Sequence, residues 1–179
     1  MAFTTKHYMA DPHFGHAAAL EWGLPSRAFG STEDMDKAII DRVNERVGAA
    51  DLLFILGDFA VSNDAEHVAH CFHALRGRKV LVTGNHDLDN KGRLKPALAG
   101  LPWDIPPSPA HETKDGGQRL YLAHYGHRVW PASHYGAWHF YGHSHGKLEP
   151  FGRSRDVGID MADMGFGPRT FAALTAGME

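Results

Sequence analysis

Four short apolar segments of this chain end in residues of the kinds that bind metal ions. Residues 80–83 run into Gly84, Asn85, His86 and Asp87. The pattern recurs at three other places, where residues 52–56 precede Gly57 and Asp58, residues 8–10 precede Asp11 and His13, and residues 140–141 precede Gly142, His143 and His145. Polar side chains at the end of a buried strand are unfavourable unless they bind something. The four strand ends therefore predict one metal site assembled from distant segments.

Length and composition predict a single globular domain spanning residues 1–179. The chain is long enough for one proper core and short for two. A net charge of −3 argues against a large binding surface for duplex nucleic acid, although a small nucleotide remains compatible with it. The 14 histidines stand out, because histidine is the commonest metal ligand and a frequent acid or base.

The sequence also predicts a cytoplasmic protein. Its single cysteine, Cys71, excludes an internal disulfide bond and fits a reducing compartment. We find no secretory signal pattern at the N-terminus and no apolar run long enough for a membrane span. No feature of the sequence indicates the oligomeric state.

Apolar periodicity divides the chain into two halves. The first half predicts strands at 3–10, 52–56 and 79–83, helices at 32–47 and 64–75, and a shorter helix at 91–99. Residues 14–30 are rich in Gly, Pro and aromatic residues and predict a loop. The second half predicts a mostly antiparallel sheet with strands near 109–114, 119–124, 138–141, 155–160 and 170–174. The fold class is therefore α/β.

The polar strand ends supply more ligands than one metal ion needs. Asp11 and His13 are two residues apart, as are His143 and His145, and such pairs share one face of an extended strand. His124 follows a further apolar run at residues 120–123. Mixtures of imidazole and carboxylate suit Mn, Fe, Co, Ni and Zn. A pair of ions roughly 3.5–4 Å apart would use the whole set and is suited to phosphoryl displacement.

In their order and spacing these motifs resemble the calcineurin-like metallophosphoesterase superfamily. The resemblance covers residues 11–145 and rests on Asp11-x-His13, Gly57-Asp58, Gly84-Asn85-His86-Asp87, His124 and Gly142-His143-x-His145. Within the superfamily the chain looks most like the small bacterial and phage enzymes that lack a cap domain. The resemblance implies a two-sheet β-sandwich flanked by helices, in four layers of αββα order.

The resemblance also implies a role for each motif residue. It places Asp11, His13 and His145 at one divalent ion and Asn85, His124 and His143 at the other. Asp58 would bridge two transition-metal ions, with Mn the preferred ion in vitro. A metal-bridging hydroxide would attack phosphorus in line with the leaving oxygen. His86 would act as general acid or stabilise the transition state, and Asp87 would orient His86 through its ring N–H.

Some neighbouring residues have both a functional and a structural interpretation. His16, Arg27 and His127 are candidate phosphate contacts, although Arg27 is more typical of a solvated loop. The aromatic and basic segment 125–139 could stack a nucleobase, but packing onto the sheet is favoured. His67, His70 and His73 favour a solvated helix face over a metal site. The segment 156–160 also resembles a late block of the superfamily and is interpreted as structural support.

The leading hypothesis is a dinuclear metallohydrolase acting on phosphodiesters, phosphomonoesters or both. Its substrate would be a small phosphate ester or a nucleotide. The alternatives are a nuclease or nucleotide pyrophosphohydrolase using the same site, and a non-catalytic metal-binding scaffold. A scaffold has no physical need for His86 beside an intact ligand set.

Overall fold

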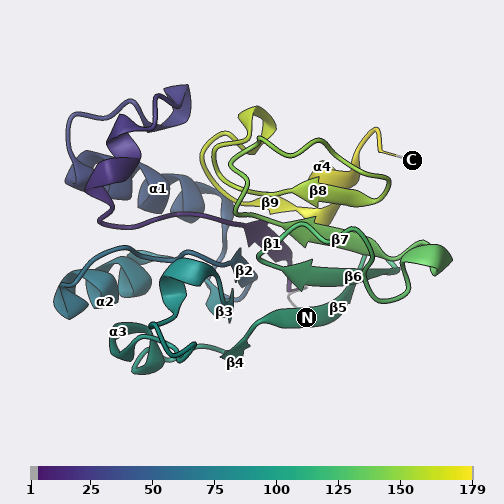
Figure 1. Cartoon of the computed structure of the whole chain (residues 1–179), viewed down its shortest axis with the longest axis horizontal. Coiled ribbons are helices and arrows are strands. Elements are labelled where there is room, and N and C mark those ends of the chain that lie inside the picture. Colours follow the sequence, from purple (N-terminus) through teal and green to yellow (C-terminus); the bar gives the residue numbers. More distant parts are fainter. Residues whose placement is uncertain (1–3, 179) are drawn as a thin grey trace.

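Two β-sheets pack against each other in the computed structural model of the chain, which describes residues 4–178 (Figure 1). The five-stranded sheet has the order β4-β3-β2-β1-β9, formed by β1 (Lys6–Met9), β2 (Leu52–Leu56), β3 (Arg78–Val82), β4 (Ile105–Ser108) and β9 (Arg169–Thr170). The four-stranded sheet has the order β5-β6-β7-β8, formed by β5 (Ala110–Asp115), β6 (Gln118–Ala123), β7 (Trp138–Tyr141) and β8 (Ser154–Asp156). The predicted α/β fold of two sheets flanked by helices is confirmed. Residue 3 of the predicted first strand lies outside the described residues.

Helices connect the first three strands of the five-stranded sheet. Helix α1 (Thr32–Arg46) follows β1 and begins at Ser31, whose side chain accepts a hydrogen bond from the Asp34 N–H. Helix α2 (Ala65–Ala74) follows β2 and begins at Asp64, which caps two backbone N–H groups. Both match the predicted helices. The predicted helix at 91–99 is shortened to α3 (Pro96–Ala99), because proline fits the first turn of a helix and not its interior.

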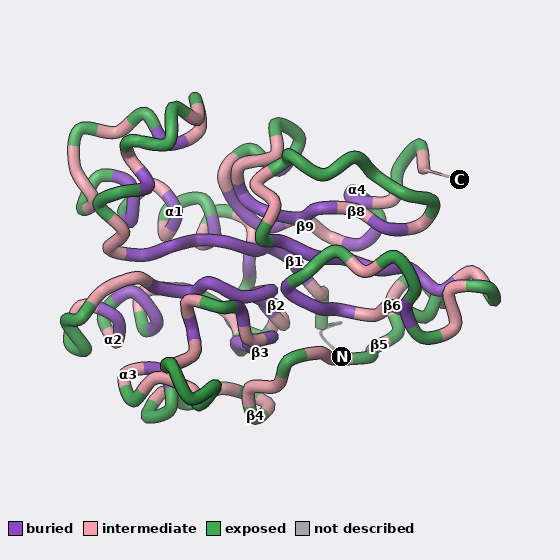
Figure 2. The backbone as a smooth tube through the Cα atoms, in the orientation of Figure 1, coloured by how far each residue is buried: buried purple, intermediate pink, exposed green. Residues whose placement is uncertain are grey.

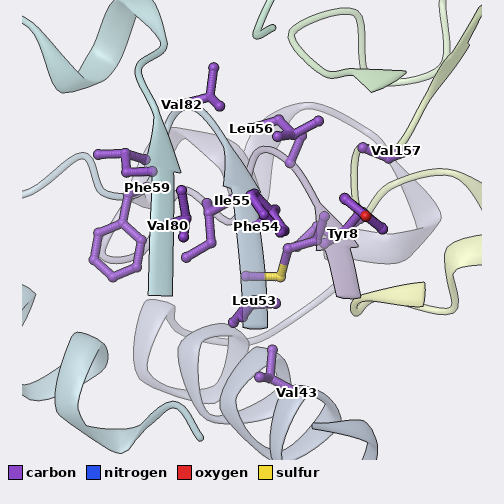
Figure 3. Close-up of a cluster of buried hydrophobic side chains, with 14 of the residues drawn as sticks. Tyr8, Val43, Leu53, Phe54, Ile55, Leu56, Phe59, Val80, Val82 and Val157 are labelled. Carbon is purple, nitrogen blue, oxygen red and sulfur yellow. The ribbon is translucent and has the colours of Figure 1, made fainter. Parts of the chain in front are cut away.

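The core lies on both faces of the five-stranded sheet, and Figure 2 shows β1 and β2 buried along almost their whole length. Successive residues of β2 face opposite ways. Leu53 lies towards Val43 of α1, whereas Phe54 stacks on Tyr8 with ring centroids 5.3 Å apart (Figure 3). Tyr8 in turn meets Phe140 of the other sheet edge to face at 5.3 Å. The two sheets therefore share one apolar core.

The second half of the chain departs from the prediction in three ways. Within the described four-stranded sheet β5 and β6 are antiparallel, whereas β6–β7 and β7–β8 are parallel, so the expectation of a mostly antiparallel sheet is wrong. The predicted strand at 170–174 is helix α4 (Phe171–Thr175), which Thr170 caps by accepting from the Ala173 N–H. Strand β4 was not predicted, because its two prolines suit only an edge strand.

The outer face of the four-stranded sheet is covered by residues 125–137. Trp130 donates its indole N–H to the Ala137 carbonyl, and the ring of His139 lies against Tyr121, His127 and Trp130. These contacts confirm that His127 and Trp130 of the aromatic segment pack onto the sheet. A 3-10 turn, Ser133–Tyr135, is the helical part of this layer. No helix within residues 4–178 combines the length and apolar character needed to cross a membrane.

Strands β1 to β4 are parallel, so their carboxyl ends meet at one edge of the sheet. The segments that follow β1, β2 and β3 carry Asp11, Asp58 and Asn85 to this edge. The Ala10 N–H donates to the Val157 carbonyl, which joins the end of β1 to the segment after β8. The same edge therefore receives residues from both sheets.

Candidate metal centre

The structure brings together all seven residues that the sequence predicts as ligands. Asp58 lies between the two halves of the set, because its Oδ2 is 3.6 Å from His13 Nε2 and 3.4 Å from His124 Nε2. His124 Nε2 is also 3.1 Å from the amide oxygen of Asn85. The set thus gathers segments as far apart in the chain as Asp11 and His145.

The ligand atoms form two clusters, which a further group links. Asp11, His13 and His145 offer atoms within 4.8 Å of one another, and so do Asp58, His124 and His143. A third group with the same spread joins His13, Asp58 and His86. Each cluster has the mixed imidazole and carboxylate chemistry that borderline divalent ions prefer.

Five of the seven residues have a left-handed backbone. The φ angles are 58° at Asp11, 52° at His13, 54° at Asp58, 66° at His143 and 46° at His145. Asp and His tolerate this conformation better than most side chains, but it still carries strain, and such strain is concentrated at functional sites. The strand ends turn sharply at these positions.

Glycines in front of the turns make room for the site. A Cβ atom on Gly57 would lie 2.2 Å from His124 Nδ1, and one on Gly142 would lie 2.7 Å from Asp11 Oδ2. Only glycine lets the backbone approach the ligand side chains so closely. The Gly-Asp and Gly-His pairs of the sequence thus have a steric reason.

Two atoms of the site are buried without a hydrogen-bond partner. Asp11 Oδ1 and His13 Nε2 have none among the described residues, although both side chains are almost fully enclosed. A buried polar atom left unpaired costs about 1–3 kcal/mol. Both atoms belong to the first cluster, so a divalent ion there would satisfy them. The residues present therefore fit a metal ion.

Metal binding is coupled to the protonation of the site. Burial lowers the pKa of His13 to about 2, so this ring is neutral and its lone pair is free. Burial raises the pKa of Asp11 to about 7, against the opposing charges of His124 and His145. Burial opposes the His124 cation, but the hydrogen bond and charge of Asp58 outweigh it and raise the pKa of His124 to about 9. A metal ion must displace the His124 proton, so binding releases protons.

Asp160 supports the site, in agreement with the interpretation of the segment 156–160 as structural support. Its Oδ2 lies 2.7 Å from His145 Nδ1, which leaves the other ring nitrogen of His145 for the cluster. Carboxylates commonly fix metal-binding histidines in this way. Asp156 accepts hydrogen bonds from Ser144, Gly146 and Gly158 and shapes the same turn. The segment 156–160 therefore supports the site through hydrogen bonds to His145 and to the turn that carries it.

Arg27 is buried and is not accessible to a substrate phosphate. Its side chain is fully buried and forms an ion pair with Asp160 at 2.8 Å. It also donates to the carbonyl oxygens of Asp11 and Pro12. Arg27 therefore holds the Asp11 turn, and both the solvated and the phosphate-binding interpretations are wrong.

Replacing Arg27 by Ala is expected to lower the free energy of unfolding by about 3–5 kcal/mol, because Asp160 keeps a buried charge without its partner. Urea unfolding measures the loss. Lys37→Ala is the matched control, since Lys37 pairs with Asp41 on the surface of α1 and such pairs contribute about 0–1 kcal/mol. Similar small losses in both variants would contradict a structural role for Arg27.

The side chains of Asp87 and His86 have different environments in the structure. The Asp87 carboxylate is buried and accepts hydrogen bonds from the backbone N–H groups of Asp58, Phe59 and Gly84. It joins two strand-end turns, and none of its hydrogen bonds in the described chain goes to the His86 ring. The expectation that Asp87 orients that ring is therefore corrected. His86 itself is held through its backbone N–H, which donates to Asp58 Oδ1 at 2.8 Å.

Of the other two candidate phosphate contacts, His16 lies at the centre and His127 does not. His16 lies at the centre, with its Nδ1 3.1 Å from His13 Nδ1 and its ring 5.7 Å from that of His86. His127 packs instead against Tyr121 and His139 on the outer face of the four-stranded sheet, away from the candidate phosphate contact assigned to it.

The sequence suggested that His67 is solvated on α2, but the structure places it in a hydrogen-bond network. Its Nε2 lies 2.8 Å from Asp36, and Asp36 also accepts the Gly15 N–H, two residues after His13. Cys71 Sγ lies 3.6 Å from the same imidazole nitrogen. This network ties both helices to the turn that carries His13. His70 and His73 are exposed, as expected.

Two aromatic residues lie at the centre: Trp22 was missed, and Tyr125 belongs to the segment 125–139, for which packing onto the sheet was favoured. The Trp22 ring lies 4.8 Å from that of His145 and 5.1 Å from that of His13. The Tyr125 ring lies 4.6 Å from that of His143, and its hydroxyl is 3.3 Å from the Asn85 amide oxygen. Neither residue has a spacing that identifies it in the sequence, although Tyr125 directly follows His124.

Comparison with curated proteins finds only partial relatives, and no protein-family model matches the chain. The uncharacterized protein MJ1445 of Methanocaldococcus jannaschii is 32% identical over 88 residues, which cover 49% of each chain. The Gene 66 protein of Mycobacterium phage D29 is 31% identical over 104 residues, covering 55% of this chain and 48% of that protein. The chain spans about half the length of the curated relatives that it matches.

A solved structure agrees over nearly the whole chain. The protein of unknown function AQ665 from Aquifex aeolicus superposes with a TM-score of 0.72 and 20% identity, covering 97% of this chain and 99% of that one. The two proteins share a fold. YfcE, a phosphoesterase from E. coli, is less similar, with a TM-score of 0.46 and 18% identity over 87% of this chain and 79% of that one. That likeness is too distant to transfer a function.

Proposed function

We propose that the protein is a metal-dependent phosphoesterase. The observation that carries the proposal is the meeting of Asp11, His13, Asp58, Asn85, His124, His143 and His145 at one edge, with two buried ligand atoms left unpaired. Asp11, His13 and His145 would hold one divalent transition-metal ion, and Asn85, His124 and His143 a second. Asp58 would contact both. Mn, Fe, Zn, Ni and Co all suit these ligands.

When bound, the ions would supply Lewis acidity for the phosphoryl group and activate the attacking water. The chain's own residues would do the rest. His86 stands beside His13 and Asp58 with its ring partly exposed, so it can donate a proton to the leaving oxygen. His16 lies next to it and can donate a hydrogen bond to a phosphoryl oxygen.

Phosphodiesters, phosphomonoesters or both are the proposed substrates, with small esters favoured over polymers. The rim of the centre carries the aromatic residues Trp22 and Tyr125, and the basic Arg27 is buried beneath it. A nuclease needs a basic track along the backbone of its substrate. Lys147 is one lysine beside His145 in the lining of the adjoining cavity, and a single lysine does not make a basic track.

Hydrolysis by metal-stripped protein tests the proposal. Bis(4-nitrophenyl) phosphate and 4-nitrophenyl phosphate are compared with and without added Mn²⁺, and metal content is measured on the same samples. We expect turnover only with metal, and the diester to monoester ratio then defines the substrate class. Two equivalents of bound metal without turnover of either ester would favour the scaffold. Absence of bound metal would overturn the proposal.

A further inference from the structure

Trp22 occupies an unusual position at the centre. It follows the 3-10 helix Ala17–Glu21, and its ring lies within 5.3 Å of the rings of His13, His16 and His145 and of the Arg27 guanidinium carbon. Despite these contacts the residue keeps 37% of its surface exposed. The exposed part of the Trp22 ring is therefore open to a ligand beside the centre.

A small cavity opens beside the exposed part of Trp22. Its volume is about 180 Å³, and it is lined by Trp22, Leu24, His145 and Lys147. Because His145 also belongs to the first ligand cluster, the cavity adjoins the centre directly. Pockets that hold drug-sized ligands are larger, roughly 300–1,000 Å³. This cavity therefore suits one ring system attached to a phosphate held outside it.

The lining identifies the kind of ring. Trp22 offers an aromatic surface for stacking and Leu24 an apolar contact, while Lys147 supplies a donor for a carbonyl oxygen. None of these four side chains has a carboxylate or amide oxygen to accept hydrogen bonds from the several hydroxyl groups of a sugar ring. A nucleobase, with a flat apolar face and polar edge, matches the lining.

We propose that this space, the Trp22 cavity, binds the nucleobase of a nucleotide ester whose phosphate lies at the metal centre. The proposal rests on the proposed function and adds its substrate class. Trp22 stacks on the base, and Lys147 donates to its edge. Such contacts tolerate different bases, because every base has a π-face.

Two esters with one leaving group test the Trp22 cavity. Thymidine 5′-(4-nitrophenyl phosphate) and ethyl 4-nitrophenyl phosphate differ only in the group that stays on phosphorus. We expect the metal-loaded protein to prefer the thymidine ester, and Trp22→Ala to lower kcat/KM for that ester about tenfold, mainly through KM. The ethyl ester should change less than about twofold. Equal losses on both esters, or no loss on either, would overturn the proposal.

Binding provides a readout that does not depend on turnover. Calorimetry compares thymidine 5′-monophosphate with inorganic phosphate. We expect Trp22→Ala to lower the affinity for the nucleotide by about tenfold and to leave the affinity for phosphate unchanged. If neither ester is hydrolysed but this difference persists, the phosphoesterase proposal fails and the Trp22 cavity stands. If the esters react equally and the nucleotide binds no better than phosphate, the cavity proposal alone fails.

Matched variants separate stacking from damage to the centre. Trp22→Phe keeps a smaller ring and should restore most of the nucleotide preference. Lys147→Ala removes the cation from an exposed position and should lower kcat/KM for the thymidine ester alone. Tyr135→Ala removes an aromatic residue that is 82% exposed in the segment over the other sheet, and it should change nothing. Metal content is measured for each variant, and a loss of preference in Tyr135→Ala would contradict the assignment.

Discussion

Replacing Asp58 by Asn is expected to remove metal binding and phosphoester hydrolysis together. The substitution keeps the shape of the side chain and the oxygen that accepts the His86 N–H. It exchanges the other oxygen, which lies between His13 Nε2 and His124 Nε2, for an amide. That group can neither neutralise metal charge nor replace the ion pair with His124.

Metal affinity should fall by more than the roughly 10–100-fold that accompanies loss of a partner outside the ligand set. Metal analysis after dialysis measures the stoichiometry, and hydrolysis of the preferred nitrophenyl ester measures activity. Asp41→Asn is the control, because Asp41 lies exposed on α1 in an ion pair with Lys37. Full metal content with normal turnover in Asp58→Asn would contradict the assignment of this residue.

Replacing His86 by Ala is expected to lower kcat by about 10²–10⁴ while metal content stays unchanged. His86 belongs to the group with His13 and Asp58 but is not among the seven proposed ligands. The size of the loss should depend on the leaving group. An alkoxide needs a proton as it departs and should suffer the full loss, whereas nitrophenolate leaves without help and should suffer a smaller one.

The leaving-group dependence separates acid catalysis from a structural role. A residue that only packs the centre would slow both kinds of ester equally. His70→Ala is the control, because His70 is exposed on α2. An equal rate loss for alkyl and nitrophenyl esters, or a fall in metal content, would show that His86 acts through the structure of the site.

The first half of the fold was predictable because its helices and strands are marked by local rules. Helix α1 has Ser31 as N-cap and apolar residues at helical spacing, and β2 is a continuous apolar run. Strand ends of parallel sheets meet, so the convergence of Asp11, Asp58 and Asn85 followed from the same rules. Their grouping in space could be anticipated before any geometry was known.

The second half depends on contacts that local sequence does not encode. Whether β7 pairs parallel or antiparallel to β6 is decided by the path of residues 124–137 over the outer face of the sheet. Residues 171–175 were predicted as part of a strand, yet Ala172, Ala173 and Leu174 favour a helix, which Thr170 caps and Phe171 anchors against Trp138 and Phe140. Tertiary contacts therefore decide the strand pairing, whereas the short helix follows the local N-cap rule that the prediction overlooked.

The supporting residues of the site were the hardest to predict. A buried arginine and a loop arginine look alike in sequence, so nothing marked Arg27 as the partner of Asp160. Asp87 follows His86 directly, which suggested a hydrogen bond between the two side chains. The structure instead directs the carboxylate towards three backbone amides, because the turn it joins would otherwise leave buried N–H groups unpaired.

The left-handed turns at Asp11, His13, Asp58, His143 and His145 set a limit on how stable this protein can become. At each of these positions glycine would relax the backbone, so the sequence that best suits the turns is one that has lost the site. At these five positions a substitution that stabilises the fold would therefore remove a ligand of the centre. Selection for a more robust chain has to act elsewhere, in the helices and sheets that surround the turns.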